Sequence, residues 1–148
     1  MKKIIFLVFT IFLSNTIWSQ EAKTLSDKNN EEEIQFELID EIPVFPGCEE
    51  KDKKETFKCF EIKLREHIIK YFRYPKKALK NNIQGKVFVS YIIDKEGKIT
   101  DISAKGGDIL LQNEAIRIIS LLPKLKPGMQ KGKPVRFKHV IPITFKLQ

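Results

Sequence analysis

The sequence is poor in the residues from which catalytic and metal sites are usually built. Its 148 residues include two cysteines and two histidines, His67 and His139. They contain no G-x-S-x-G nucleophile motif, no phosphate-binding glycine loop, and no histidines or cysteines at metal-ligand spacing. His67 is expected to be a partly exposed helix residue, and His139 a hydrogen-bonded core residue on an apolar strand face. We therefore expect a protein that is not an enzyme and that has no cofactor or metal site.

Long apolar runs are also scarce. The run near the start, residues 4–13, is ten residues long and follows two lysines. A transmembrane helix needs about 20 apolar residues, whereas a positive start and a short apolar core are typical of a secretory signal peptide. We predict a signal peptide at 1–19, cleaved after Ser19, with an uncleaved anchor through residues 4–18 as the alternative. No cysteine follows the run, which argues against a lipoprotein anchor.

The two cysteines, Cys48 and Cys59, do not form a C-x-x-C motif, so their spacing does not indicate a redox site. In an exported protein an even pair is interpreted first as a disulfide. Such a bond would close a loop of about 12 residues and contribute roughly 3 kcal/mol in the chain-entropy model. Two buried free thiols are the alternative.

Acidic residues are concentrated before position 60 and are scarce after it. Residues 20–59 carry 6 Lys or Arg against 12 Asp or Glu, whereas residues 60–148 carry 19 against 7. The basic part could meet an acidic peptide, a membrane surface, a nucleic acid or the chain's own acidic lead, or it could be a well-solvated surface. A nucleic acid fits poorly, because export removes the protein from it and no interleaving of aromatic and basic residues on one surface is evident.

The first half of the chain predicts one amphipathic helix after a polar lead. Residues 20–41 are acidic and poor in Gly and Pro, which favours disorder or a loose helix. From Phe60 to Phe72 apolar residues recur every four positions, which predicts an amphipathic helix that Pro75 ends. The expected organisation is a signal peptide at 1–19, an acidic lead at 20–41, a cysteine-containing lead and helix at 42–73, and a domain at 74–148.

The second half alternates short helices with strands. The sequence predicts a short helix after Pro75, a central strand at 85–94 covered on both sides, a hairpin turn, and a returning strand at 98–105. Asp108 is expected to cap a helix that Pro123 ends. This order, with a further strand at the end, is typical of an α+β domain with helices on one face of a small antiparallel sheet.

Residues 134–147 predict the last strand, because apolar and polar residues alternate along them. They follow a basic loop at 123–134. His139 and Pro142 interrupt the alternation. Proline has no N–H to give to a sheet, so Pro142 indicates an edge strand or a bulge. An edge strand can bind a partner by accepting an additional strand.

From Tyr74 onward the chain resembles the carboxy-terminal domain of TonB, the energy-transducing protein of Gram-negative envelopes. The resemblance covers residues 74–147 and rests on an ordered set of residues rather than on one motif. The matching residues are Tyr74-Pro75, Ala78, Ile83-Gln84-Gly85, Asp94, Gly97, Leu111, Glu114-Ala115, Leu122-Pro123, Lys126-Pro127-Gly128, Gly132-Lys133-Pro134-Val135 and Ile141-Pro142-Ile143-Thr144-Phe145. The preceding stretch EIPVFPGCEE resembles a segment of related envelope proteins of the Bacteroidetes type.

The resemblance implies a three-stranded antiparallel sheet backed by helices on one face. It also implies that the terminal strand binds the TonB-box peptide of a TonB-dependent outer-membrane receptor by strand addition, in the periplasm. The expected contacts are alternate residues of that strand: Arg136, Lys138, Val140, Pro142, Thr144 and Lys146. Inner-membrane proton-channel proteins of the ExbB/ExbD type are further expected partners, and a homodimer is left open.

Departures from the family leave the energy-transducing role open. A full transducer carries a long anchor and a long proline-rich spacer, whereas residues 20–41 contain no proline. Their reach is at most about 70–80 Å when fully extended. Leu125 also stands where the family usually has an aromatic residue. The alternative is a soluble periplasmic peptide-binding module that transduces no energy.

Overall fold

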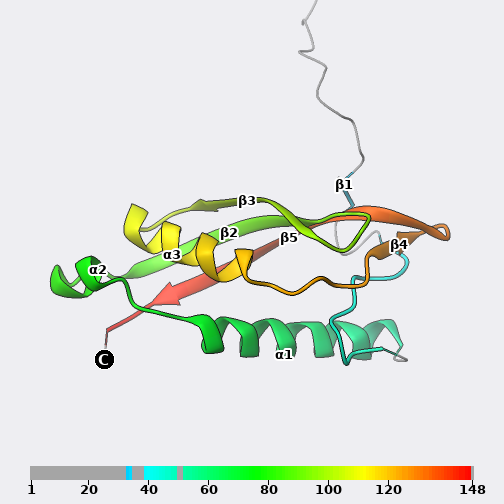
Figure 1. Ribbon diagram of the computed structural model, residues 1–148, viewed down its shortest axis with the longest axis horizontal. Coiled ribbons are helices and arrows are strands. Elements are labelled where there is room, and N and C mark those ends of the chain that lie inside the picture. The colour runs from blue at the N-terminus through cyan, green and yellow to red at the C-terminus, as the bar shows by residue number, and fades with distance from the viewer. Residues whose placement is uncertain (1–32, 35–38, 50–51, 148) are drawn as a thin grey trace, which may run out of the picture. The chain divides into compact units, whose positions relative to one another are not determined.

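The computed structural model describes residues 33–34, 39–49 and 52–147 (Figure 1). The expected signal peptide at 1–19 and most of the acidic lead at 20–41 lie outside these residues. None of the helices that the structure describes combines the length and the apolar character that a membrane span requires.

The described residues form three helices and five strands. The helices are α1 Lys53–Tyr71, α2 Lys76–Lys80 and α3 Ile109–Ser120. The strands are β1 Glu33–Ile34, β2 Gly85–Ile93, β3 Ile99–Lys105, β4 Gly128–Gln130 and β5 Lys133–Phe145. Strands β2, β3 and β5 lie where the sequence patterns predict them, whereas β1 and β4 have no counterpart among the predicted elements.

Strand β2 is central, as its apolar composition predicts. It pairs antiparallel with β5 in one unbroken register from Gly85↔Phe145 to Ile93↔Phe137, and it pairs antiparallel with β3 on its other edge. The expectation that both faces of β2 are covered is only partly correct. Ile92 is buried, but Phe88, on the same side of the strand, is 49% exposed.

Two short strands extend the expected three-stranded sheet. β4 forms a hairpin with the start of β5, and the two turn residues, Lys131 and Gly132, both have positive φ, as a two-residue hairpin turn requires. β1 pairs in parallel with β5 through Arg136 and Phe137. The count of three was therefore too low. Strands of two or three residues are too short to show a period-two pattern, so β1 and β4 could not be predicted from it.

Helix α1 begins well before the periodic stretch that predicted it. Asp52 caps the helix, and its side chain accepts a hydrogen bond of 2.8 Å from the backbone N–H of Glu55. The first turns carry few apolar residues, which is why the pattern became visible only at Phe60. In α3, the predicted cap is confirmed, because the Asp108 carboxylate accepts from the N–H of Leu110 at 2.8 Å.

Helices α1 and α3 lie side by side over one face of the sheet (Figure 1). The core between them and the sheet combines buried apolar residues from every layer. These include Phe60 and Leu64 of α1, Leu111, Ala115 and Ile119 of α3, Val87, Val89, Tyr91 and Ile93 of β2, and Phe137, Ile141, Ile143 and Phe145 of β5.

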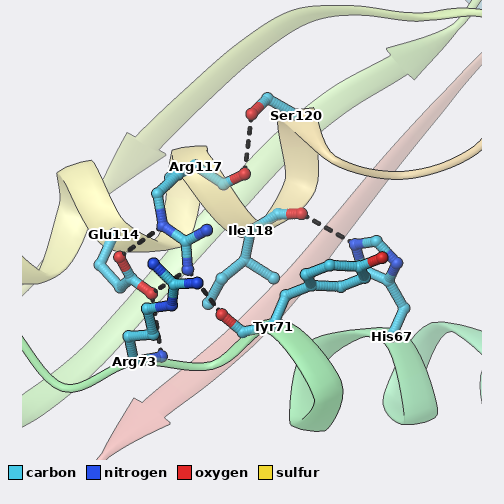
Figure 2. A network of polar contacts seen from close by, with 7 residues as sticks. All are labelled: His67, Tyr71, Arg73, Glu114, Arg117, Ile118 and Ser120. Carbon is cyan, nitrogen blue, oxygen red and sulfur yellow. Dashed lines mark hydrogen bonds and ion pairs between the residues drawn. The ribbon is translucent and has the colours of Figure 1, made fainter.

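Polar contacts join the end of α1 to α3 (Figure 2). The Arg117 guanidinium donates to both oxygens of Glu114 and to the backbone C=O of Tyr71. His67 Nε2 lies 2.9 Å from the backbone oxygen of Ile118. His67 is buried, so the expectation of a partly exposed residue was wrong. Its ring fills the space between the two helices, which no pattern within α1 could reveal.

The predicted disulfide between Cys48 and Cys59 is confirmed, with the two Cα atoms 5.9 Å apart. It ties the segment before α1 to the first half of the helix. The same segment is also hydrogen-bonded to the loop before β4, because the N–H of Val44 donates to the C=O of Lys126 at 3.0 Å. Helix α1 is therefore held at its start by a covalent bond and at its end by the contacts to α3.

Candidate peptide-binding groove

The second half of β5 is paired along one edge only. β2 pairs with residues 137–145, β4 with residues 133–135 and β1 with residues 136–137. From residue 138 to residue 145, no strand in the described part of the chain pairs with the side of β5 that faces away from β2. We call this side of residues 138–145 the outer edge. It carries backbone groups that an additional strand could use.

Pro142 indicates which backbone groups face the outer edge. In an antiparallel ladder, alternate residues direct their N–H and C=O groups toward the partner strand and away from it. Pro142 lies opposite Phe88 within the unbroken register of β2 and β5, and it has no N–H to donate. The ladder stays regular if Pro142 occupies an outward-facing position. The N–H groups of Lys138, Val140 and Thr144 then face outward as well.

Helix α1 lies beside the outer edge, and the two enclose a groove of about 670 Å³. The ring of Phe60 lies 5.4 Å from that of His139, and the ring of Phe72, at the C-cap of α1, lies 5.2 Å from that of Phe145. Helix and strand therefore run in the same direction (Figure 1). The groove is lined by Glu61, Leu64, Arg65, Ile68, Ile69 and Phe72 on one side, and by His139, Val140, Ile141, Pro142, Ile143 and Thr144 of β5 on the other.

The groove is apolar at one end and charged at the other. Ile69 is 70% exposed and Phe72 is 36% exposed at the apolar end, which is unusual for large apolar side chains and is typical of an interaction surface. Val140 of β5 is 52% exposed and lies nearer the charged end, because its neighbour His139 contacts Phe60. Glu61 and Arg65 are exposed toward the opposite end. Neither forms an ion pair or hydrogen bond with another residue that the structure describes.

His139 lies at the floor of the groove as a hydrogen-bonded residue. Its Nδ1 lies 3.0 Å from the hydroxyl of Tyr91, and its ring also contacts those of Phe60 and Phe137. Burial lowers the pKa of His139 to about 4, and burial raises the pKa of Tyr91. Both side chains are therefore neutral at pH 7, and the floor of the groove carries no charge.

The six predicted contact residues have different surroundings in the structure. Val140, Pro142 and Thr144 line the groove. Arg136 lies where β1 already pairs with β5, and its guanidinium forms an ion pair of 2.8 Å with Asp101. Lys138 is exposed on β5, and Lys146 follows the end of the strand. Their contact role stays a prediction.

The α1 side of the groove was not predicted from sequence. The periodic pattern placed Ile68 and Phe72 on a helix, but it did not say which strand edge that helix would accompany. A weak signal was present, because Ile69 adds an apolar residue beside the main stripe and widens it. A widened apolar stripe is expected when a helix faces both a core and a second surface.

The largely antiparallel sheet, the helices on one face and the terminal strand with its outer edge define a small α+β domain. Residues 70–147 match the family model described as the Gram-negative bacterial TonB protein C-terminal. The chain belongs to this family. No curated protein matches this sequence.

A solved structure agrees with the family. An NMR structure of the TonB C-terminal domain of Helicobacter pylori is 30% identical in sequence, with a TM-score of 0.50. The match covers 60% of this chain and 81% of that one. A second NMR structure of the same domain is 31% identical over 59% of this chain and 92% of that one, with a TM-score of 0.41.

Proposed function

We propose that this protein binds an extended segment of a TonB-dependent outer-membrane receptor as an additional strand on the outer edge of β5. The observation that carries the proposal is the outer edge at residues 138–145, together with the exposed apolar groove beside it. Family membership supports a receptor segment as the partner. The proposed role is binding rather than catalysis, and the proposed location is the periplasm.

The energetics favour a strand that also fills the groove. Each backbone hydrogen bond to the outward groups of Lys138, Val140 and Thr144 would contribute about 0.5–1.5 kcal/mol. A few such bonds do not offset the 4–15 kcal/mol, roughly, that association costs in lost freedom. Alternate side chains of an added strand point to one face, here toward α1. Burying them against Ile69 and Phe72 supplies the remaining free energy, at about 25 cal/mol per Å² of apolar area.

The binding test uses synthetic peptides from the segments that precede receptor plug domains. We expect saturable binding by calorimetry, with the affinity reduced at least about tenfold, or 1.4 kcal/mol, by Val140→Pro or Thr144→Pro. These substitutions remove outward N–H groups without removing a bond to β2. If the wild-type protein binds no peptide, or if both proline variants bind as well as wild type, strand addition at this edge is wrong.

The proposal includes a further role, energy transduction together with ExbB/ExbD-type proteins. The alternative is a soluble module that binds peptides and transduces no energy. Cell fractionation separates them. Retention in the inner membrane after a salt wash supports an anchored transducer. Release with the periplasmic fraction contradicts an anchored transducer and supports the soluble module.

A further inference from the structure

The residues of α1 that line the groove form a stripe parallel to the outer edge. Glu61, Arg65 and Ile69 recur every four residues, and Phe72 follows at the end of the helix. Between its two ring contacts with β5 the helix rises about 18 Å, at about 1.5 Å per residue. β5 extends about 20 Å between the same contacts, at about 3.3 Å per residue. The helix and the outer edge therefore cover nearly equal lengths, which correspond to about six residues of an extended chain.

The spacing of this stripe matches one face of an added strand. Arg65 and Ile69 are about 6 Å apart along the helix axis. Residues n and n+2 of a strand share a face and lie about 6.6 Å apart. A strand on the outer edge would thus place one inward side chain beside Arg65 and the next one beside Ile69. Phe72 closes the groove beyond Ile69.

The charges of the groove favour an acidic residue beside Arg65. The Arg65 guanidinium has no ion pair among the described residues, although Glu61 is one turn away. Residues 60–148 carry 19 basic against 7 acidic residues, so the field of the domain attracts an acidic segment. A carboxylate beside Arg65 would form a charge-assisted bond at the rim. The position beside Glu61 then suits an uncharged or basic residue.

The α1 side of the groove lies largely outside the residues that match the family model. The family match begins at residue 70, after Glu61, Arg65 and Ile69. The disulfide between Cys48 and Cys59 holds the start of the same helix in place. The residues that face an incoming strand from α1 are therefore a rigid addition to the domain.

We propose that α1 selects the partner by reading alternate side chains of the bound strand. In a strand added parallel to β5, the preferred segment has an acidic residue beside Arg65 and apolar residues two and four positions along, beside Ile69 and Phe72. This inference rests on the proposed strand addition. It deepens that proposal, because main-chain bonding to β5 does not discriminate among sequences, whereas the α1 side does.

The first test uses two synthetic peptides of equal composition and about eight residues. One has the pattern acidic-x-apolar-x-apolar with Ser or Thr at each x. In the other the acidic and apolar residues are rearranged so that no two of them are two positions apart. We expect the first peptide to bind the disulfide-bonded protein at least about tenfold more tightly in fluorescence anisotropy titrations. Equal binding of the two peptides overturns the inference.

The second test changes the helix. Ile69→Asp should weaken binding of the first peptide at least about tenfold, or 1.4 kcal/mol. Ile62→Asp is the matched control, because Ile62 is an exposed α1 residue, 47% exposed, that does not line the groove. It should change affinity by less than about twofold. Both residues are exposed enough to be replaced without unfolding, which circular dichroism checks.

A charge exchange completes the test. Arg65→Glu should weaken the acidic peptide and strengthen a peptide with lysine at the acidic position, which a merely structural role would not do. If Val140→Pro abolishes binding while Ile69→Asp and Arg65→Glu leave affinity and preference unchanged, α1 does not select the partner and strand addition stands. If the wild-type protein binds neither these peptides nor receptor segments, strand addition itself is wrong.

Discussion

The two edges of β5 belong to one strand and face different surroundings. Toward β2, nine residue pairs in unbroken register use the backbone groups within the sheet. Toward α1, no strand that the structure describes uses those of residues 138–145, and exposed apolar side chains of Ile69 and Val140 stand nearby. Pro142 is compatible with both, because its missing N–H falls on the outer side. One edge therefore supplies stability, and no described strand uses the hydrogen-bonding groups of the other at residues 138–145.

Proline substitutions should distinguish the two edges of β5 most strongly. Ile141→Pro should lower the free energy of unfolding by about 3 kcal/mol or more, because the Ile141 N–H faces β2 and the ring would disrupt the ladder. Urea unfolding followed by circular dichroism measures the change. Val140→Pro is the matched control and should cost less than about 1 kcal/mol while removing peptide binding. Similar destabilisation by both would contradict the assignment of the two edges.

Removing the disulfide tests whether peptide binding at the outer edge requires α1 to be held in place. Replacing Cys48 and Cys59 with alanine should lower the free energy of unfolding by about 3 kcal/mol, since the unfolded chain loses its cross-link. Thermal unfolding measures the loss, and the same variant should bind peptide more weakly. A reductant should reproduce both effects in the wild type and neither in the double variant. An equal response of the double variant would show that the disulfide is not the cause.

His139, at the floor of the groove, should make the stability of the protein depend on pH. Burial lowers the pKa of His139 to about 4, from an ordinary value of 6.5. Between these values the unfolded chain binds a proton that the folded chain does not, so stability falls as the pH falls from about 6.5 to 4. The loss should reach up to about 3 kcal/mol.

Urea unfolding at several pH values measures this dependence. His139→Gln keeps a hydrogen-bonding group beside Tyr91 without a titrating ring, and its stability should depend less on pH within the window. An unchanged pH dependence in the variant would assign the effect to other groups.

The smallest effect is expected at the exposed rim of the outer edge. Lys138→Glu should weaken an acidic peptide by a few-fold, within the range of about 0.2–1 kcal/mol that exposed charges contribute, and high salt should reduce the difference. Stability should be nearly unchanged. Titrations at low and high ionic strength measure both the effect and its screening. A large, salt-independent loss would mean that Lys138 makes a buried contact.

Local patterns were sufficient to predict the three long strands of the sheet and the disulfide that fixes α1. The period-two alternation located β5, and Pro142 indicated an edge strand, because both features depend on the geometry of a few consecutive residues. Asp108 was identifiable as a helix cap for the same reason. Cys48 and Cys59 could be paired because an exported chain with two cysteines has one pairing to offer.

Contacts between segments far apart in the chain could not be predicted from the sequence. β4 and β1 pair with β5 through two or three residues each, too few to form a pattern. His67 is buried because α3 lies against α1, which depends on residues far along the chain. The sequence also did not show that β1 pairs with β5 at Arg136, or that Asp101 forms an ion pair with the Arg136 guanidinium.

The sequence alone was sufficient to predict a terminal strand whose proline suits an edge or a bulge, an amphipathic helix before the domain, and membership of the TonB C-terminal domain family. The position of α1 parallel to the outer edge, where Arg65 and Ile69 line the groove, is known from the tertiary structure alone. Periodicity reports which side of each element is apolar, because that depends on backbone geometry. It does not report which elements meet, because that depends on how all the apolar sides are buried together.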